Sequence, residues 1–334
     1  MIEPIILFLV PLLISLTASF LIIRFFRVRL LDTPNHRSSH QAPTPRGGGI
    51  ALACGVIVAS LAAWNFGLMH SPAMYWLILL AGFMAFLGAC DDLFDLNVFV
   101  RLITQCVLAG TGVFLLGVSN EWGREAQFLI AILMILFIVW MTNLYNFMDG
   151  INGLAAIEGI TVSLSMGLIY WVYTDEIEVV YVLAVIGAST CGFLFWNFPS
   201  AKLFMGDSGS LFLGFSFGVL IAGSIAKDFH LVVAWLIALA VFITDASYTL
   251  AYRLLTKQAI HQAHRTHTYQ KLAIRLNSHT KTTTCATLIN LLWLLPIAIS
   301  VASSKLNPIL AMLIAYTPLL LIAHKIKAGR IQEG

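Results

Sequence analysis

The chain has 334 residues, of which 59% are hydrophobic and only 10% are charged. Soluble globular domains carry about a quarter charged residues, so this composition excludes a water-soluble globular protein. The formal net charge is only +3. The basic residues gather in the predicted cytoplasmic loops, so this charge reflects membrane topology rather than nucleic-acid binding. The five cysteines form no C-x-x-C pair, which indicates neither a zinc site nor a disulfide framework.

Apolar stretches of membrane length recur along the whole chain. A bilayer core of about 30 Å requires about 20 helical residues, and backbone polar groups cannot remain unpaired in lipid, so these stretches must be helices. The predicted spans lie near 5–24, 47–66, 74–90, 99–117, 127–146, 153–172, 179–197, 210–226, 230–250, 284–303 and 308–324. We therefore predict an all-α, polytopic integral membrane protein of about eleven transmembrane helices, with residues 1–334 forming a single membrane domain.

The basic residues predict the orientation of these spans. Three arginines within 24–29 follow the first span instead of preceding it, so this span is not a cleavable signal peptide. Cytoplasmic loops are enriched in Lys and Arg, which places the N-terminus outside and the C-terminus in the cytoplasm. All lysines and arginines except Arg124, Lys227 and Lys305 then lie on the cytoplasmic side. The longer polar loops lie there too, so we expect the active site on that face.

The first of these loops, DTPNHRSSHQAPTPRGGG at 32–49, combines Asp32, Arg37, His40 and Arg46 with three prolines and a glycine triplet. Prolines stiffen a loop, and glycines let the backbone approach a ligand or another helix. An ordinary linker does not need this density of special residues. We therefore interpret Arg37, His40 and Arg46 as candidate substrate-binding residues.

Asp91 and Asp92 follow the span 74–90, with Asp95 one turn further on. Adjacent carboxylates at a membrane boundary repel each other, and a divalent cation or a shared proton relieves the repulsion. From this segment alone, a solvated helix end explains the pair equally well.

The segment NLYNFMDGINGLAAIEG at 143–159 holds a cluster of amide and acidic side chains: Asn143, Asn146, Asp149 and Asn152. Such groups at a helix end within a bilayer are costly unless they bind something, and the glycines of the segment indicate a break in the helix. A plain turn would explain Asp149 and its following glycine but not the asparagines. Glu158 lies further into the next helix, where a structural and a catalytic role remain equally open.

The segment FMGDSGSLFLG at 204–214 places Asp207 between two glycines at the start of a span. Small residues let backbone amides approach an anion at a helix N-terminus, while the carboxylate can hold a metal. A simple helix N-cap is the alternative, and capping does not exclude metal binding.

The last polar loop contains a basic, histidine-rich segment at 260–275, with His261, His264, Arg265 and His267. Zinc is an alternative, but the segment lacks the cysteine or glutamate partner that would make this spacing persuasive. Cations and imidazoles facing a membrane site more naturally hold phosphates. Carboxylates that bind a metal, combined with cations that bind phosphates, are the usual groups of phosphoryl transfer.

Read in order, these segments resemble the polyprenyl-phosphate N-acetylhexosamine-1-phosphate transferases. The motifs are DD at 91–92, NLYNFMDGING at 143–153, MGDSGS at 205–210 and the loop histidines at 264 and 267. The resemblance covers residues 32–275, and the number of spans also agrees with that family.

The resemblance implies roles for individual residues. Asp91 and Asp92 are similar to the acidic pair implicated in magnesium binding and in activating the lipid phosphate. Asn146 and Asp149 are similar to positions for nucleotide binding and catalysis. The resemblance makes Asp207 a metal ligand, with Asp92 as a second one. The catalytic set is thus Asp91, Asp92 and Asp149, and the substrate-binding set also includes Asn143, Asn152, His264, Arg265 and His267.

Two departures from the family pattern concern the pathway. Asn152 stands where an aspartate is common, and His264 and His267 are separated by two residues instead of forming a near-contiguous run. Both features are similar to the branch that begins O-antigen or related surface polysaccharides. They also leave the identity of the N-acetylated sugar open.

The resemblance implies that a UDP-linked N-acetylated sugar donates its sugar-1-phosphate to undecaprenyl phosphate, with release of UMP. The cofactor would be Mg²⁺, with Mn²⁺ able to substitute, and the location would be the bacterial inner (cytoplasmic) membrane. Direct attack and a double displacement through a phosphorylated aspartate both remain open, as does a monomer or a homodimer. A secondary transporter is the rival hypothesis, but transporters usually show repeated halves and binding groups near the midplane. A structural membrane subunit would not require so many costly polar groups.

Overall fold

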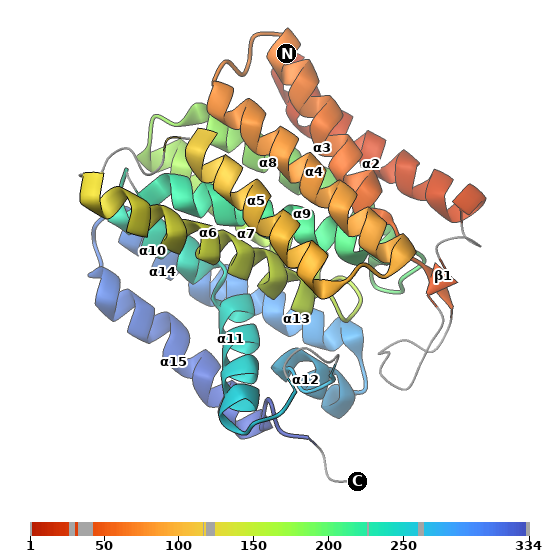
Figure 1. The fold of residues 1–334 in the computed structure, drawn as a ribbon, viewed down its shortest axis with the longest axis vertical. Helices are drawn as coiled ribbons and strands as arrows, with labels where there is room; N and C mark the ends of the chain where they lie inside the picture. The colour runs from red at the N-terminus through yellow and green to blue at the C-terminus, as the bar shows by residue number, and fades with distance from the viewer. Residues whose placement is uncertain are drawn as a thin grey trace.

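The computed structural model is a bundle of membrane-length helices (Figure 1) and describes residues 2–26, 31–32, 43–115, 117, 124–225, 227–259 and 264–331. In this part of the chain ten helices are long and apolar enough to span a membrane, and a bent pair makes eleven if it is counted as one span. These counts confirm the prediction of a multi-pass, all-α membrane protein.

The helices follow the predicted spans closely. The first span consists of α1 (Ile2–Pro4), η1 (Ile5–Leu9), α2 (Val10–Leu21) and η2 (Ile22–Phe26). The following helices are α3 (Gly48–Asn65), α4 (Pro72–Phe94), α5 (Val98–Leu115), α6 (Arg124–Phe147), α7 (Leu154–Tyr173), α8 (Ile177–Asn197) and α9 (Gly206–Ile225). The C-terminal part contains α10 (Phe229–Ala238), α11 (Ala240–Leu255), α12 (Thr268–Leu276), α13 (His279–Ile289), η3 (Asn290–Leu294), α14 (Leu295–Ala302) and α15 (Pro308–Ile326).

Helix α9 lies at the centre of the bundle, because 89% of the residues in its apolar stretch are buried by neighbouring helices. It packs mainly on α4 and α6 and also contacts α3. A side chain at Gly88 of α4 would lie 2.4 Å from the backbone of Asp207, so a glycine there allows α4 to approach the start of α9. The close approach brings two of the predicted acidic segments together.

The predicted continuous span 230–250 is wrong as a single helix. The chain bends by 74° between α10 and α11, with Leu239 at the break. Neither glycine nor proline marks the break, so the continuous apolar run gave no signal of it. Tertiary packing accounts for the change of direction, since α10 packs on α14 while α11 packs on α15 (Figure 1).

Helices α11 and α12 lie beside the C-terminal end of α15, at the lower side of the molecule in Figure 1. Lys271 of α12 donates to the carbonyl oxygens of Lys327 at 2.5 Å and of Arg330 at 2.8 Å. Gly329 donates its backbone N–H to Thr266 O at 2.9 Å. Part of the predicted loop 251–283 is therefore the helix α12, which hydrogen bonds hold against residues 327–330.

A short antiparallel pair, β1 (Leu31–Asp32) and β2 (Thr44–Pro45), is the sheet found in the described residues. The chain after β2 runs alongside the segment before α9, because Phe204 N donates to Pro45 O at 2.8 Å. Gly48 N in turn donates to Phe204 O at 2.9 Å. These bonds flank Arg46 in the chain and position it next to the start of α9.

Candidate active site

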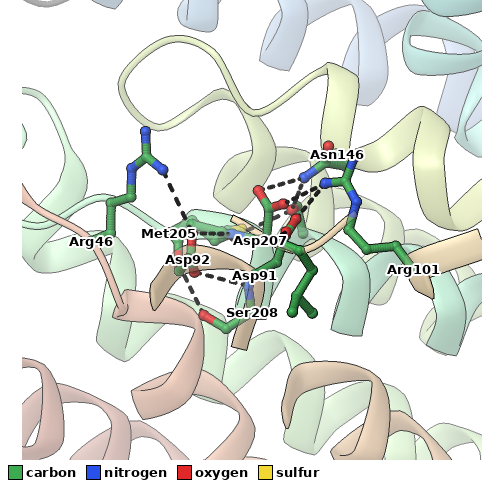
Figure 2. Close-up of polar contacts among 11 residues, drawn as sticks. Arg46, Asp91, Asp92, Arg101, Asn146, Met205, Asp207 and Ser208 are labelled. Atoms are coloured by element: carbon green, nitrogen blue, oxygen red, sulfur yellow. Dashed lines mark hydrogen bonds and ion pairs between the residues drawn. The ribbon is translucent and has the colours of Figure 1, made fainter. Parts of the chain in front are cut away.

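A polar cavity of about 220 Å³ lies where the C-terminal end of α4 meets the N-terminal ends of α5 and α9. Seven residues line it: Arg46, Asp91, Asp92, Asp95, Leu96, Arg101 and Asp207. Figure 2 shows Asp91, Asp92 and Asp207 grouped between two arginines that approach from opposite sides. The predicted acidic segments therefore form one site.

Asp91 is buried, with 7% of its surface exposed. Its Oδ2 accepts from Arg101 Nη1, and its Oδ1 accepts from the backbone N–H of Leu96 at 2.8 Å. The second bond fixes the turn that links α4 to α5. Asp91 thus holds Arg101 over the cavity and shapes the chain that carries it.

Asp92 faces the N-terminus of α9. Its Oδ1 accepts from the backbone N–H of Asp207 at 3.1 Å and its Oδ2 from that of Ser208 at 3.3 Å. Gly206 has φ of +71°, and a side chain there would come within 2.5 Å of the Asp92 carboxylate. A carboxylate at a helix N-terminus compensates the free N–H groups and the positive end of the helix dipole. Asp92 therefore caps α9 from another helix, with Arg46 Nη1 3.9 Å away.

Asp207 points into the cavity and is 27% exposed. Its Oδ1 accepts from Asn146 Nδ2 at 2.9 Å, and its Oδ2 lies 3.4 Å from Arg101 Nη1. Asn146 also donates to Ser210 Oγ at 3.0 Å, which fixes its amide between α6 and α9. One guanidinium nitrogen thus contacts both Asp91 and Asp207.

Asp149 lies in the break between α6 and α7, where the glycines predicted it. Burial, followed by the negative charges of Asp207 and Asp92, raises the pKa of Asp149 well above its ordinary value. The loop of Asp149 therefore lies close enough to the acidic cavity to interact with it electrostatically.

The histidine segment is organised by Asp245 of α11. This buried carboxylate accepts from the backbone N–H groups of Thr268 at 2.7 Å and Tyr269 at 2.8 Å, and His267 Nδ1 lies 3.3 Å away. Tyr269 Oη donates to Phe147 O at 3.1 Å. Asp245 therefore caps α12 and orients His267, while Tyr269 joins α12 to the loop of Asp149.

His264 stacks on His267 with ring centroids 5.0 Å apart. Burial, followed by repulsion from His267 and Arg253, lowers the pKa of His264 to about 4. His264 is therefore neutral at physiological pH and acts as a hydrogen-bonding group rather than as a cation. Arg265 lies in the turn between these histidines and is near enough to influence the Tyr269 phenol electrostatically.

Two of the predicted substrate-binding asparagines have partners outside the cavity. Asn143 donates to Gln105 Oε1 at 2.6 Å and to Val139 O at 2.8 Å. Asn152 donates from its side chain to Pro199 O at 3.2 Å. Their contact with a substrate stays a prediction.

Other predicted residues lie beyond what the structure describes. Arg37 and His40 fall within 33–42, and His261 falls within 260–263, all outside the described residues. Their predicted roles are therefore untested.

Sequence reasoning missed Arg101 and Asp245 as functional residues. Both were visible as ionisable groups within predicted apolar spans, which is a signal for function or for a buried partner. Only the fold shows their partners, since Arg101 and Asp207 are 106 positions apart in the chain and Asp245 and Thr268 are 23 apart.

The chemistry of the cavity suits a hard cation, because Asp91 and Asp207 supply oxygen donors of the kind that Mg²⁺ prefers. Both already converge on one cationic group, the Arg101 guanidinium. Among the described residues, however, no three acidic, histidine or cysteine side chains are arranged as a ready metal-binding cluster. The predicted metal ligand Asp92 instead contacts the backbone of α9, and its role as a ligand stays a prediction.

Residues 74–225 match the family described as Glycosyl transferase family 4. The chain is 32% identical over 283 residues to the probable undecaprenyl-phosphate N-acetylglucosaminyl 1-phosphate transferase of Bacillus subtilis, covering 81% of this chain and 78% of that protein. It is 30% identical over 251 residues to the decaprenyl-phosphate N-acetylglucosaminephosphotransferase of Mycolicibacterium smegmatis, covering 65% and 61%. With the undecaprenyl-phosphate alpha-N-acetylglucosaminyl 1-phosphate transferase of Yersinia pestis it shares 29% identity over 202 residues, covering 57% and 54%.

Proposed function

The chain belongs to glycosyl transferase family 4, among the polyprenyl-phosphate N-acetylhexosamine-1-phosphate transferases, and we propose a reaction for it. It transfers an N-acetylated sugar-1-phosphate from a UDP-sugar to undecaprenyl phosphate. The observation that carries the proposal is the cavity in which Asp91 and Asp207 contact a single arginine nitrogen between them. Phosphate groups carry the negative charge that Arg101 and Arg46 can bind, and the carboxylates can hold the accompanying cation.

In the proposed reaction, an oxygen of the lipid phosphate attacks the phosphorus atom that is linked to the sugar through an oxygen. The bond from that phosphorus to the oxygen it shares with the uridine-linked phosphorus breaks, and UMP departs with that oxygen. A phosphate monoester has its second pKa near 6, so at neutral pH the lipid phosphate is mostly a dianion. The protein therefore has little need to remove a proton, and positioning of the two substrates dominates.

The cavity residues have separate tasks in this proposal. Arg101 and Arg46 bind phosphate oxygens, while Asn146 fixes the orientation of Asp207 by its hydrogen bond at 2.9 Å. Asp91 and Asp207 would hold Mg²⁺, which when bound neutralises charge on the pyrophosphate and on departing UMP. Asp92 holds the start of α9, and hence Asp207, in place.

We further propose that this face is cytoplasmic and that the membrane is the bacterial inner membrane. The distribution of Lys and Arg supports this orientation. Single-cysteine variants in a background without native cysteines test it: K257C should be labelled only from the cytoplasm and K305C only from outside, since both positions are exposed. Labelling of K257C from outside intact cells would contradict the orientation.

An O-antigen or related surface polysaccharide is the proposed destination of the product. Asn152 and the separated histidines support this branch over the peptidoglycan enzyme. A panel of UDP-linked N-acetylated sugars, offered to the purified protein one at a time, would identify the preferred donor.

The experiment that tests the function is UMP release by purified protein supplied with undecaprenyl phosphate and a UDP-sugar. We expect release that requires both substrates, together with a lipid-linked sugar diphosphate as the second product. Uptake of nucleotide sugar into proteoliposomes without UMP release would contradict the transferase and support a transporter.

A further inference from the structure

A second polar cluster lies inside the bundle, within the membrane-spanning part of α7. Glu158 is 1% exposed, and Thr161 and Asn290 are also buried. Asn290 belongs to η3, in the span that follows α12. A buried carboxylate in such a place is costly and requires either a partner or a function.

The hydrogen bonds of this cluster are nearly complete. Asn290 Nδ2 donates to Glu158 Oε2 at 2.6 Å and to Thr161 Oγ1 at 3.0 Å. Thr161 Oγ1 in turn donates to Glu158 O at 3.1 Å. Both amide N–H groups, the threonine hydroxyl and one carboxyl oxygen are therefore satisfied.

Two atoms remain, and both are acceptors. Glu158 Oε1 and Asn290 Oδ1 are fully buried and have no hydrogen-bond partner in the described part of the chain. An ionised glutamate offers only acceptors, whereas a protonated one has an O–H donor. A proton on Glu158 Oε1 that is shared with Asn290 Oδ1 would satisfy both atoms.

The charges around Glu158 agree with a neutral acid. No lysine, arginine or histidine of the described residues forms an ion pair with it. Tyr145 of α6 is near enough to interact electrostatically with Glu158, but its hydroxyl donates to Ala155 O at 2.7 Å. An isolated carboxylate in such surroundings protonates instead of remaining charged.

We infer that Glu158 is a neutral carboxylic acid paired with Asn290. Its Oε1–H donates to Asn290 Oδ1, while Asn290 Nδ2–H donates to Glu158 Oε2. The two side chains thus form a closed acid–amide ring within the membrane, which joins α7 to η3.

The location of this pair gives it a positioning role. Asn290 begins a π-helical turn in which Leu295 N donates to Asn290 O, directly before Pro296, which has no N–H. Irregular turns of this kind are weak points of a helix unless a neighbour fixes them. The same span also holds the loop of Asp149, because Thr283 Oγ1 donates to Asn152 O at 2.9 Å. The acid–amide ring therefore keeps the helix under that loop in register; its consequence for turnover rests on the proposed function.

Infrared spectroscopy of the purified protein in lipid tests the protonation directly. At pH 7 to 8 the wild type should show the C=O stretching band of a protonated carboxylic acid, and the E158Q variant should lose a matching part of it. E176Q is the control, because the Glu176 side chain is partly exposed to solvent and paired with Lys227, so this variant should lose only carboxylate absorption. Loss of a carboxylate band in E158Q would show an ionised Glu158 and overturn the inference.

Thermal unfolding provides a second test that does not depend on turnover. Glutamine retains one donor and one acceptor, so E158Q should unfold within a few degrees of the wild type. N290L removes the partner and should unfold at a clearly lower temperature. Equal destabilisation by E158Q and N290L would overturn the neutral ring and indicate that the negative charge is needed. For the positioning role, turnover should fall in N290L and be retained in E158Q; the reverse order would contradict it.

Discussion

The protein uses buried carboxyl groups in two contrasting ways. Asp91 near the C-terminal end of α4 and Asp207 near the N-terminal end of α9 share one arginine and face a cavity. Within α7, Glu158 is sealed in the bundle and bonded to an uncharged amide. In the first arrangement the carboxyl groups line a cavity where a cation or a substrate can contact them, whereas in the second a single proton would complete the hydrogen bonds.

The comparison teaches that burial alone does not identify a catalytic acid. The two regions differ in their partners and in access: Asp91 and Asp207 contact an arginine and line a cavity, whereas Glu158 contacts an amide and is sealed in the bundle. The same substitution of a carboxyl group by an amide should therefore have opposite consequences in the two places. Each prediction below tests one side of this contrast.

The largest effect is expected from removal of divalent cations. The proposed ligands are carboxylates, so a hard cation should be required and excess EDTA should abolish UMP release. Added Mg²⁺ should restore it, and Mn²⁺ should substitute. Full turnover in excess EDTA would contradict a metal-dependent acidic cavity.

Asp207→Asn should lower turnover about 1,000-fold, a barrier increase of about 4 kcal/mol. The substitution keeps the size of the side chain but removes one charge from the cavity, so the dependence on Mg²⁺ should weaken at the same time. Turnover should fall more than apparent substrate affinity if the contact strengthens in the transition state. Steady-state UMP release measures both, and Asp175→Asn, at an exposed position outside the cavity, is the matched control.

Arg101→Ala should lower turnover about 100-fold, or about 2.7 kcal/mol. It removes a phosphate-binding group and leaves Asp91 and Asp207 without their shared cation. Arg101→Lys should restore part of the activity, because it returns the charge without the planar fork. The same assay applies, with Lys305→Ala at an exposed position as the control. A wild-type rate in Arg101→Ala would contradict a role for Arg101 in the site.

The smallest effect is expected from Glu158→Gln, which should keep turnover within about tenfold, or about 1.4 kcal/mol. An amide can replace a neutral acid in the ring with Asn290. An inactive Glu158→Gln beside a normal Asp207→Asn would reverse the contrast and move the catalytic centre into the bundle. Both variants must first be shown to reach the membrane in normal amounts, since a misfolded protein would imitate a catalytic defect.

The membrane spans could be predicted from the sequence almost to their ends, because long apolar runs have few alternatives in lipid. The predicted 153–172 and 179–197 correspond to α7 (Leu154–Tyr173) and α8 (Ile177–Asn197). The break between α10 and α11 could not be predicted in the same way. Apolar composition reports burial in lipid, but it carries no information about the direction in which a helix runs.

The candidate site was predictable as a set of segments but not as a set of contacts. Clusters of acids and amides at span ends identified Asp91, Asp92, Asn146, Asp149 and Asp207, and the structure places them around one cavity and the adjoining loop. Asn143 belonged to the same motif, yet it donates to Gln105 instead. The face of α6 on which Asn143 lies contacts α5, and only the packing of these two helices shows that Gln105 is its partner.

Composition and the order of the motifs are local properties, and they were enough to place this chain in a membrane with acids and cations gathered in its loops. Three contacts depend instead on how distant helices pack: Arg101 joins Asp91 to Asp207, Asp92 caps α9, and Asn290 donates to Glu158. Such contacts connect positions up to 132 residues apart. Hydrogen bonds and ion pairs depend on the distance and direction between two groups, and helix packing, which no local pattern encodes, sets both.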